Sequence, residues 1–247
     1  MASTIVGYIE AKPPTQENLE VVETSDQLKR YLYTFYNLIL TNFFQFRLYR
    51  NGGLIDTVQI ARPFTVYKLK SIPQAEKEDE FLELLEKFFA FSLPKTYTAK
   101  SLAVELAKRT RFLKDLILLE LEREKSEKKP GFTSGFYEAF QKHLIGSLTQ
   151  NDFADLYAQT ITYGLFAART RAKNGFNRKL AYDLIPRTIG ILRDVFRFIS
   201  LEDPPKQMEW TIDDVAEVLA VANVETILQE RKGRDPIVQV DTMHNQL

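Results

Sequence analysis

Cysteine is absent from the sequence, and the only two histidines are His143 and His244. Without cysteine the chain has no disulfide bonds, no thiolate zinc sites and no cysteine nucleophiles. The two histidines lie far apart in sequence, so we expect no histidine-rich metal site. A chain without cysteine is suited to a reducing compartment, and we expect a cytoplasmic protein.

Long hydrophobic runs are missing as well. No apolar stretch approaches the roughly 20 residues that a membrane-spanning helix requires, and residues 1–9 lack the basic and apolar segments of a signal peptide. Hydrophobic residues make up 45% of the 247 residues and charged residues 27%, as in an ordinary globular protein. We therefore expect a folded protein with no membrane partner, built as one large domain or two small ones.

The net charge is zero, but the charges are unevenly distributed. Residues 76–86 are strongly acidic, whereas eight basic side chains gather further along the chain: Arg169, Arg171, Lys173, Arg178, Lys179, Arg187, Arg193 and Arg197. Such a basic segment can face phosphates even in a neutral protein. The alternative is an ordinary solvated helix face.

The first 70 residues have the pattern of a small mixed sheet. β-Branched and aromatic residues favour strands at 4–11, 37–41, 43–49 and 54–61. Thr24 or Ser25 can cap a helix at 26–35, and Asn51-Gly52-Gly53 is a hairpin turn signal. The predicted order is strand, helix, strand, strand, strand.

After Pro63 the sequence becomes helical, and we place the boundary between the two parts near Ser71. Apolar residues at helical spacing predict helices at 76–92, 99–125, 134–148, 152–171, 182–199 and 212–229. The fold class expected is α+β. Residues 1–70 would form a truncated nuclease-like sheet with one helix, and residues 71–247 a mainly α-helical bundle.

Glu10 and Lys12 end the first predicted strand, and strand alternation puts them on one face. A carboxylate beside a lysine suits metal-assisted phosphodiester hydrolysis. The carboxylate holds a divalent ion through oxygen, and the lysine positions or helps to deprotonate the attacking water. The alternative is an exposed strand end without chemistry.

Residues 8–49 resemble the PD-(D/E)xK nucleases, because a Glu-x-Lys strand precedes a helix that bears Gln27 and Tyr31. The resemblance is in particular to single-chain restriction–modification enzymes, in which a nuclease is fused to an adenine-N6 DNA methyltransferase. It implies that Glu10 is a metal ligand, Lys12 the catalytic lysine and Gln27 the accessory residue that orients the site. It also implies Mg²⁺ as the cofactor of the intact nuclease.

The helical part is similar to the connector of the same enzymes. The similar stretches are 153–169, which is the most specific match, 184–188 and 235–238. Residues 153–169 have the apolar spacing of an amphipathic helix, in which Gly164 permits close approach of a neighbour. The resemblance implies that the connector binds double-stranded DNA, and that its basic residues contact the DNA backbone without reading bases.

The sequence departs from this family in two ways. The family's second metal ligand is an aspartate on an earlier strand, and the sequence offers no equivalent, since Asp26 and Asp56 belong to other elements. The methyltransferase motifs are also missing. The ten glycines form no Gly-rich turn for S-adenosylmethionine, and Asp203-Pro204-Pro205 is followed by Lys206 instead of an aromatic residue.

Three hypotheses remain open from the sequence. The chain is a fragment of a restriction–modification enzyme that binds DNA but is not catalytic alone, with a separate methyltransferase polypeptide as a possible partner. It is, alternatively, a metal-dependent nuclease subunit completed by another chain. The third hypothesis is a helical scaffold or regulatory protein in which Glu10 and Lys12 are surface residues.

Overall fold

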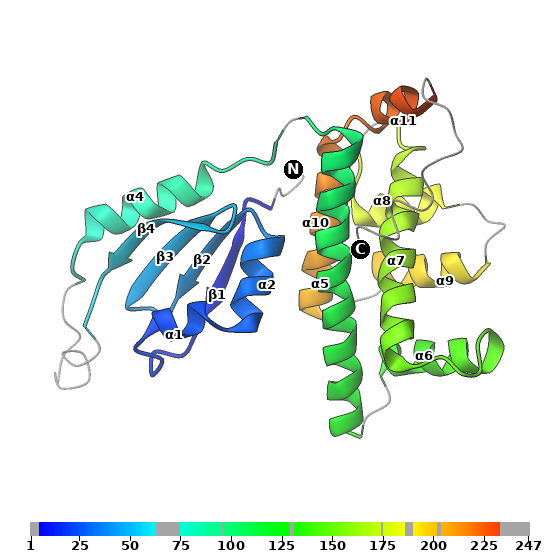
Figure 1. Ribbon diagram of the computed structural model, residues 1–247, viewed down its shortest axis with the longest axis horizontal. Helices are drawn as coiled ribbons and strands as arrows, with labels where there is room; N and C mark the ends of the chain where they lie inside the picture. The colour runs from blue at the N-terminus through cyan, green and yellow to red at the C-terminus, as the bar shows by residue number, and fades with distance from the viewer. Residues whose placement is uncertain are drawn as a thin grey trace. The chain divides into compact units, whose positions relative to one another are not determined.

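The computed structural model describes residues 5–62, 75–94, 96–128, 131–173, 175–185, 190–201 and 204–232. In these residues the chain is an α+β protein with one four-stranded mixed sheet and ten helices (Figure 1). This confirms the α+β class predicted from the sequence. The chain divides into two compact units, Met1–Leu93 and Pro94–Leu247.

The division between the units differs from the boundary expected near Ser71, a residue outside the described ranges. Helix α4 (Glu78–Phe89) belongs to the first unit because its apolar side packs on the sheet. The helical pattern of this segment was visible in the sequence. The surface that covers its apolar side was not, because helical spacing carries no information about the neighbour.

The sheet has the strand order β1-β2-β3-β4, with bounds Tyr8–Ala11, Asn37–Thr41, Gln45–Arg50 and Gly53–Gln59. β1 runs parallel to β2, and the other two pairs are antiparallel. A parallel pair requires a crossover connection, which here contains α1 (Leu19–Glu23) and α2 (Asp26–Thr34). β2 is buried along its whole length, whereas β1 is an edge strand of the described sheet.

Two details of the first unit bear on the predicted elements. Ser25 caps α2, because its side-chain oxygen accepts a hydrogen bond from the backbone of Leu28 at 3.2 Å. β3 begins at Gln45, two residues later than predicted. The reason is that the Asn42 side chain accepts the backbone N–H groups of Phe44 and Gln45 at 3.1 and 2.9 Å, which forms a turn.

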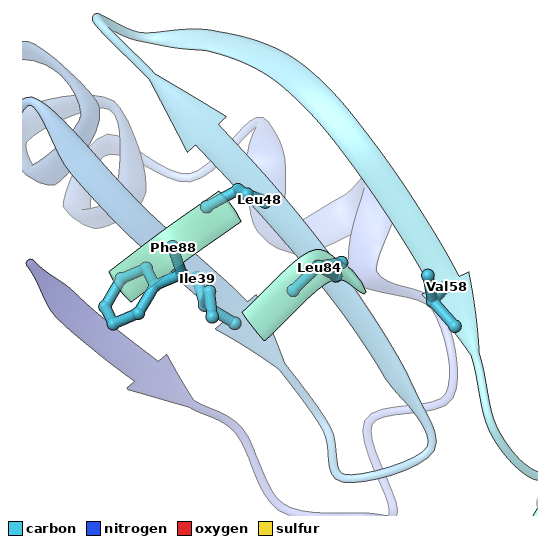
Figure 2. Close-up of a cluster of buried hydrophobic side chains, with 5 residues drawn as sticks. All are labelled: Ile39, Leu48, Val58, Leu84 and Phe88. Carbon is cyan, nitrogen blue, oxygen red and sulfur yellow. The ribbon is translucent and has the colours of Figure 1, made fainter. Parts of the chain in front are cut away.

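Helix α4 covers one face of the sheet (Figure 2). Leu84 and Phe88 of α4 pack against Ile39, Leu48 and Val58 from three successive strands, and all five are at most 3% exposed. Full burial of such side chains stabilises by about 1.5–3 kcal/mol each. This cluster is therefore the core that fixes the sheet.

The start of β1 approaches α4 closely at Gly7. A Cβ atom on Gly7 would lie 2.6 Å from the carbonyl oxygen of Asn37 and 2.7 Å from the ring of Phe88. The Asn37 side-chain amide donates to the carbonyls of Val6 and Phe88, both at 2.9 Å. Asn37 thus connects the start of β1 to the end of α4, and only glycine fits between them.

The second unit is helical throughout its described part. Its helices are α5 (Ala99–Ser126), α6 (Phe132–His143), α7 (Gln150–Arg169), α8 (Arg178–Leu184), α9 (Gly190–Leu201), α10 (Lys206–Val221) and α11 (Val224–Lys232). α5 packs against α7 and α10, and α7 also contacts α8, α9 and α10 (Figure 1). Within the described ranges, no helix combines the length and the apolar character needed to cross a membrane.

Two helices predicted as continuous are each divided in the structure. The segment 182–199 contains the end of α8 and most of α9, because Ile185 precedes a proline and adopts an extended backbone. The segment 212–229 contains parts of α10 and α11, because the backbone of Ala222 is extended and Asn223 then caps α11 by accepting from the Thr226 N–H at 3.2 Å. The apolar residues keep helical spacing across both breaks, so the spacing alone predicted one continuous helix in each segment.

A buried ion network joins α5 to α10. The side chain of Arg109, which is 1% exposed, donates to Asp214 at 2.5 Å and to Glu105 at 2.7 Å. Burial opposes ionisation, but the two carboxylates outweigh it and raise the pKa of Arg109. Since an unpaired buried charge is costly, this network specifies which helix faces meet.

Candidate functional site

Four side chains from the β1 end and α2 form a hydrogen-bonded series, which we call the β1–α2 cluster. Lys12 Nζ donates to Glu10 Oε1 at 2.6 Å and to Gln27 Oε1 at 3.1 Å. Gln27 Nε2 donates in turn to the hydroxyl of Tyr31 at 3.1 Å. The structure thus brings together the residues that the sequence pattern had grouped.

Local folding rules explain how these residues meet. The parallel register places Glu10 opposite Leu40, so Glu10 lies on the sheet face away from α4. Lys12 follows β1 and continues its pairing, because its backbone N–H donates to Thr41 at 2.7 Å. Gln27 and Tyr31 lie one helical turn apart on α2 and therefore share a face.

The cluster is partly shielded from water. The side chains of Glu10 and Lys12 are 20% and 22% exposed, so their ion pair is screened less than one on an open surface. β1 is nonetheless an edge strand, so the cluster lies at a border of the described sheet. The polar atoms of the cluster are held in place by one another.

The described residues do not by themselves fit a magnesium ion. They contain no group of three or more His, Cys, Asp or Glu side chains placed to hold a metal. In the β1–α2 cluster Glu10 is the single carboxylate, and Lys12 occupies one of its oxygens. Asp56 lies on β4 and pairs with Lys87 at 2.6 Å, while the Asp26 side chain is 96% exposed beside Lys29.

A second charged cluster lies on the same face of the sheet and was not identified from the sequence. Arg47 stands opposite Leu40 in the β2–β3 register, so it shares the face of Glu10. Arg47 donates to Glu23 of α1 at 2.5 Å, and the hydroxyl of Tyr49 donates to the same carboxylate. Burial, and then the Glu23 charge, raise the pKa of Tyr49. Polar residues at alternate positions of β3 were the available signal.

Two of the eight basic residues proposed to contact DNA instead form hydrogen bonds that hold α10 in place. The Arg178 side chain is 4% exposed and donates to Glu209 and Asp213 of α10, both at 2.7 Å. Arg169 donates to the carbonyl of Leu219 at 2.9 Å, at the end of α10. Both side chains hold α10 in place, so their guanidinium groups are occupied and we exclude them from the proposed DNA interface.

The remaining basic residues differ in how accessible they are. Arg193 lies over the ring of Tyr182 at 4.6 Å and donates to its hydroxyl at 2.9 Å. The exposed members are Arg171 and Lys173 in the loop after α7, Lys179 in α8 and Arg197 in α9, and these three helices pack against one another. Arg171 also donates to the carbonyl of Leu184 at 3.2 Å, and Arg197 pairs with Asp194 at 3.5 Å. Arg187 lies outside the described residues.

The stretch 153–169 forms most of α7 and packs in the centre of the second unit. Phe153 and Tyr157 are fully buried and stacked on one another, and Gly164 is buried as well. A hydrogen bond of 2.8 Å joins the hydroxyls of Thr110 and Thr162, which connects α5 to α7. Phe153 and Tyr157 therefore serve packing, whereas Tyr163 of the same stretch is exposed.

Comparison of the sequence with family models and with curated proteins, and of the structure with solved structures, gives no match. We therefore infer a function from the geometry of the β1–α2 cluster and from the exposed basic residues of the second unit.

Proposed function

We propose that the chain is part of a DNA restriction–modification enzyme, in which the first unit is a nuclease-type module and the second a helical connector that contacts the DNA backbone. The isolated chain binds DNA and does not cleave it. The sheet with α2 is the truncated nuclease-like core of this proposal, and the helical bundle is the connector.

The observation that carries the proposal is the position of the Lys12 ammonium group between Glu10 Oε1 and Gln27 Oε1, at 2.6 and 3.1 Å. Here Gln27 is itself oriented by Tyr31, so a lysine is fixed beside a carboxylate at a strand end. This is the arrangement expected of half a phosphodiesterase centre, in which Lys12 positions water and Glu10 holds a metal ion.

The missing half explains why we expect no catalysis. Mg²⁺ prefers several oxygen ligands in octahedral geometry, and the described residues supply one carboxylate at this position. The sequence has no Gly-rich turn of the kind that binds S-adenosylmethionine. We therefore assign no S-adenosylmethionine site and place methylation on another polypeptide.

The connector part of the proposal depends on exposed cations. Arg171 and Lys173 lie in the loop between α7 and α8, and Lys179 lies in the first turn of α8. Cations on such a surface release counterions from DNA when they bind phosphates, so affinity falls as salt rises. These contacts position the protein and add no sequence specificity.

Two assays test the proposal. Duplex DNA incubated with the chain and MgCl₂ should stay intact, and duplex affinity measured by fluorescence anisotropy should fall with increasing potassium chloride. Replacing Lys173 and Lys179 with Gln should weaken binding, whereas Lys142→Gln, an exposed lysine on α6, should not. Affinity that does not respond to salt would count against the connector role.

A second candidate function is a metal-dependent nuclease subunit completed by another chain. The observation that favours it is the edge position of β1, because an edge strand can pair with a further strand that brings a second carboxylate. Magnesium-dependent cleavage that Glu10→Ala and Lys12→Ala both abolish would favour this candidate over an inactive part. Cleavage unaffected by either substitution would exclude both.

A further inference from the structure

A bulky aromatic residue occupies a strained position next to the β1–α2 cluster. Phe43 has φ +69° in the turn between β2 and β3, and its side chain is 55% exposed. Left-handed backbone is unfavourable for a residue with a large side chain, and glycine or asparagine adopts it more easily. Exposure also forgoes the stabilisation that burying an aromatic ring provides. Phenylalanine is therefore unfavourable for stability at this turn.

The turn that carries Phe43 is rigidly held. The hydroxyl of Thr41 accepts the N–H of Phe43 and donates to the carbonyl of Gln45, both at 2.9 Å. Asn42, which is 1% exposed, accepts from Phe44 and Gln45 and donates to the carbonyl of Gln16 at 2.8 Å. The exposed ring therefore stands on a braced turn.

The same turn is joined to the strand that carries the candidate site. β1 and β2 are parallel, with Ala11 opposite Thr41, so their carboxyl ends lie at one edge of the sheet. The Lys12 N–H donates to the carbonyl of Thr41 at 2.7 Å. Lys12 thus contacts Thr41, and Phe43 lies two residues after Thr41. Phe43 is therefore at the edge of the sheet where β1 ends, close in the fold to Glu10 and Lys12.

We propose that Phe43 is a base-stacking residue, which binds an unpaired base of DNA beside the phosphodiester at the β1–α2 cluster. This inference rests on the proposed function. Every base has an aromatic face, so stacking on a phenylalanine tolerates any sequence. Phe43 would therefore favour DNA with unpaired bases over a fully paired duplex, and the strained turn presents its ring to solvent.

The test compares a duplex that contains a short unpaired stretch with the same duplex fully paired. We expect wild type to bind the first more tightly. Phe43→Asn, which suits the left-handed backbone, should lower that affinity on the order of tenfold, leave the paired duplex unchanged and keep or raise the melting temperature. Phe43→Trp should retain affinity. Phe89→Ala, which removes an exposed ring on α4, is the matched control and should change neither affinity.

A local signal separates stacking from a general loss of binding. Phe43→Trp in a Trp210→Phe background places the single tryptophan of the chain at the turn, and its emission should be quenched by unpaired bases and not by the paired duplex. Equal weakening of both DNAs by Phe43→Asn, or unchanged emission, would overturn the inference while the proposed function stands. If wild type binds neither DNA, the proposed function fails, and this inference with it.

Discussion

Adjacent residues Arg178 and Lys179 should have opposite roles, and substituting each one separately tests this. Arg178 joins α8 to α10 through Glu209 and Asp213, whereas Lys179 is exposed. Removing one partner of a buried ion pair costs about 3–5 kcal/mol. Asp213 is 35% exposed, so water compensates part of the loss, and we expect about 2–3 kcal/mol for Arg178→Met.

The assay is urea denaturation of both variants together with anisotropy on duplex DNA. The free energy of unfolding of Arg178→Met should be lower by this amount, which is equivalent to a melting temperature lower by roughly 5–10 °C. At temperatures below its unfolding transition, Arg178→Met should bind DNA as wild type does. Lys179→Met should keep its stability and bind DNA more weakly. The reasoning would be refuted if Arg178→Met were as stable as wild type, or if Lys179→Met were the variant that unfolds early.

The stability lost in Arg178→Met should depend on pH. Burial opposes ionisation of Glu209, but Lys206 and Arg178 outweigh burial and lower the pKa of Glu209 from its usual 4.5. A carboxylate with a lowered pKa in the folded state stabilises the fold above the unfolded-state pKa, and this contribution disappears as the pH falls through the folded-state pKa. The difference between wild type and Arg178→Met should therefore be full at neutral pH and shrink as the pH falls below 4.5 and through the lowered pKa of Glu209.

Three further outcomes follow from the packing and the site. Gly7→Ala should destabilise the protein by about 1–3 kcal/mol in urea denaturation, because the added Cβ would overlap Asn37. Gly135→Ala in α6 should be neutral or stabilise by up to about 1 kcal/mol, because a Cβ added there would meet no neighbouring atom within 4 Å. Arg109→Met should cost about 3–5 kcal/mol, since two buried carboxylates lose the guanidinium group that lies between them. Added MgCl₂ should raise the melting temperature of wild type by no more than it raises that of Glu10→Gln, because a single carboxylate binds Mg²⁺ weakly.

Local sequence signals predicted most elements of the first unit. β2 and α2 begin where β-branched residues and the Ser25 cap placed them, and the pairing of Glu10 with Lys12 followed from strand alternation. Signals of this kind act within a few residues, which is why they are visible in the sequence. The contact of Gln27 with Lys12 spans 15 residues, and its prediction depended on a family resemblance.

Contacts between residues far apart in the chain could not be predicted from the sequence pattern. The placement of α4 on the sheet depends on Leu84 and Phe88 meeting strand residues that lie 26 to 49 positions earlier in the chain. Arg178 looked like any other cation of its segment, because charge alone does not show that Glu209 and Asp213 of α10 will surround it. Phe43 read as a strand residue, because the braced turn depends on how the Asn42 side chain bonds in three dimensions.

If the first unit is a nuclease-type module, bound DNA places a phosphate beside Lys12 in the β1–α2 cluster, and the salt dependence of duplex affinity in three variants tests this most directly. Lys12→Gln should weaken binding and reduce the slope of log affinity against log salt by about 0.9, while Glu10→Gln, which removes a repelling charge, should strengthen binding. Lys29→Gln, at an exposed position on α2, should change neither. If the slope and affinity of Lys12→Gln equal those of wild type, the DNA does not reach this site and the account is contradicted.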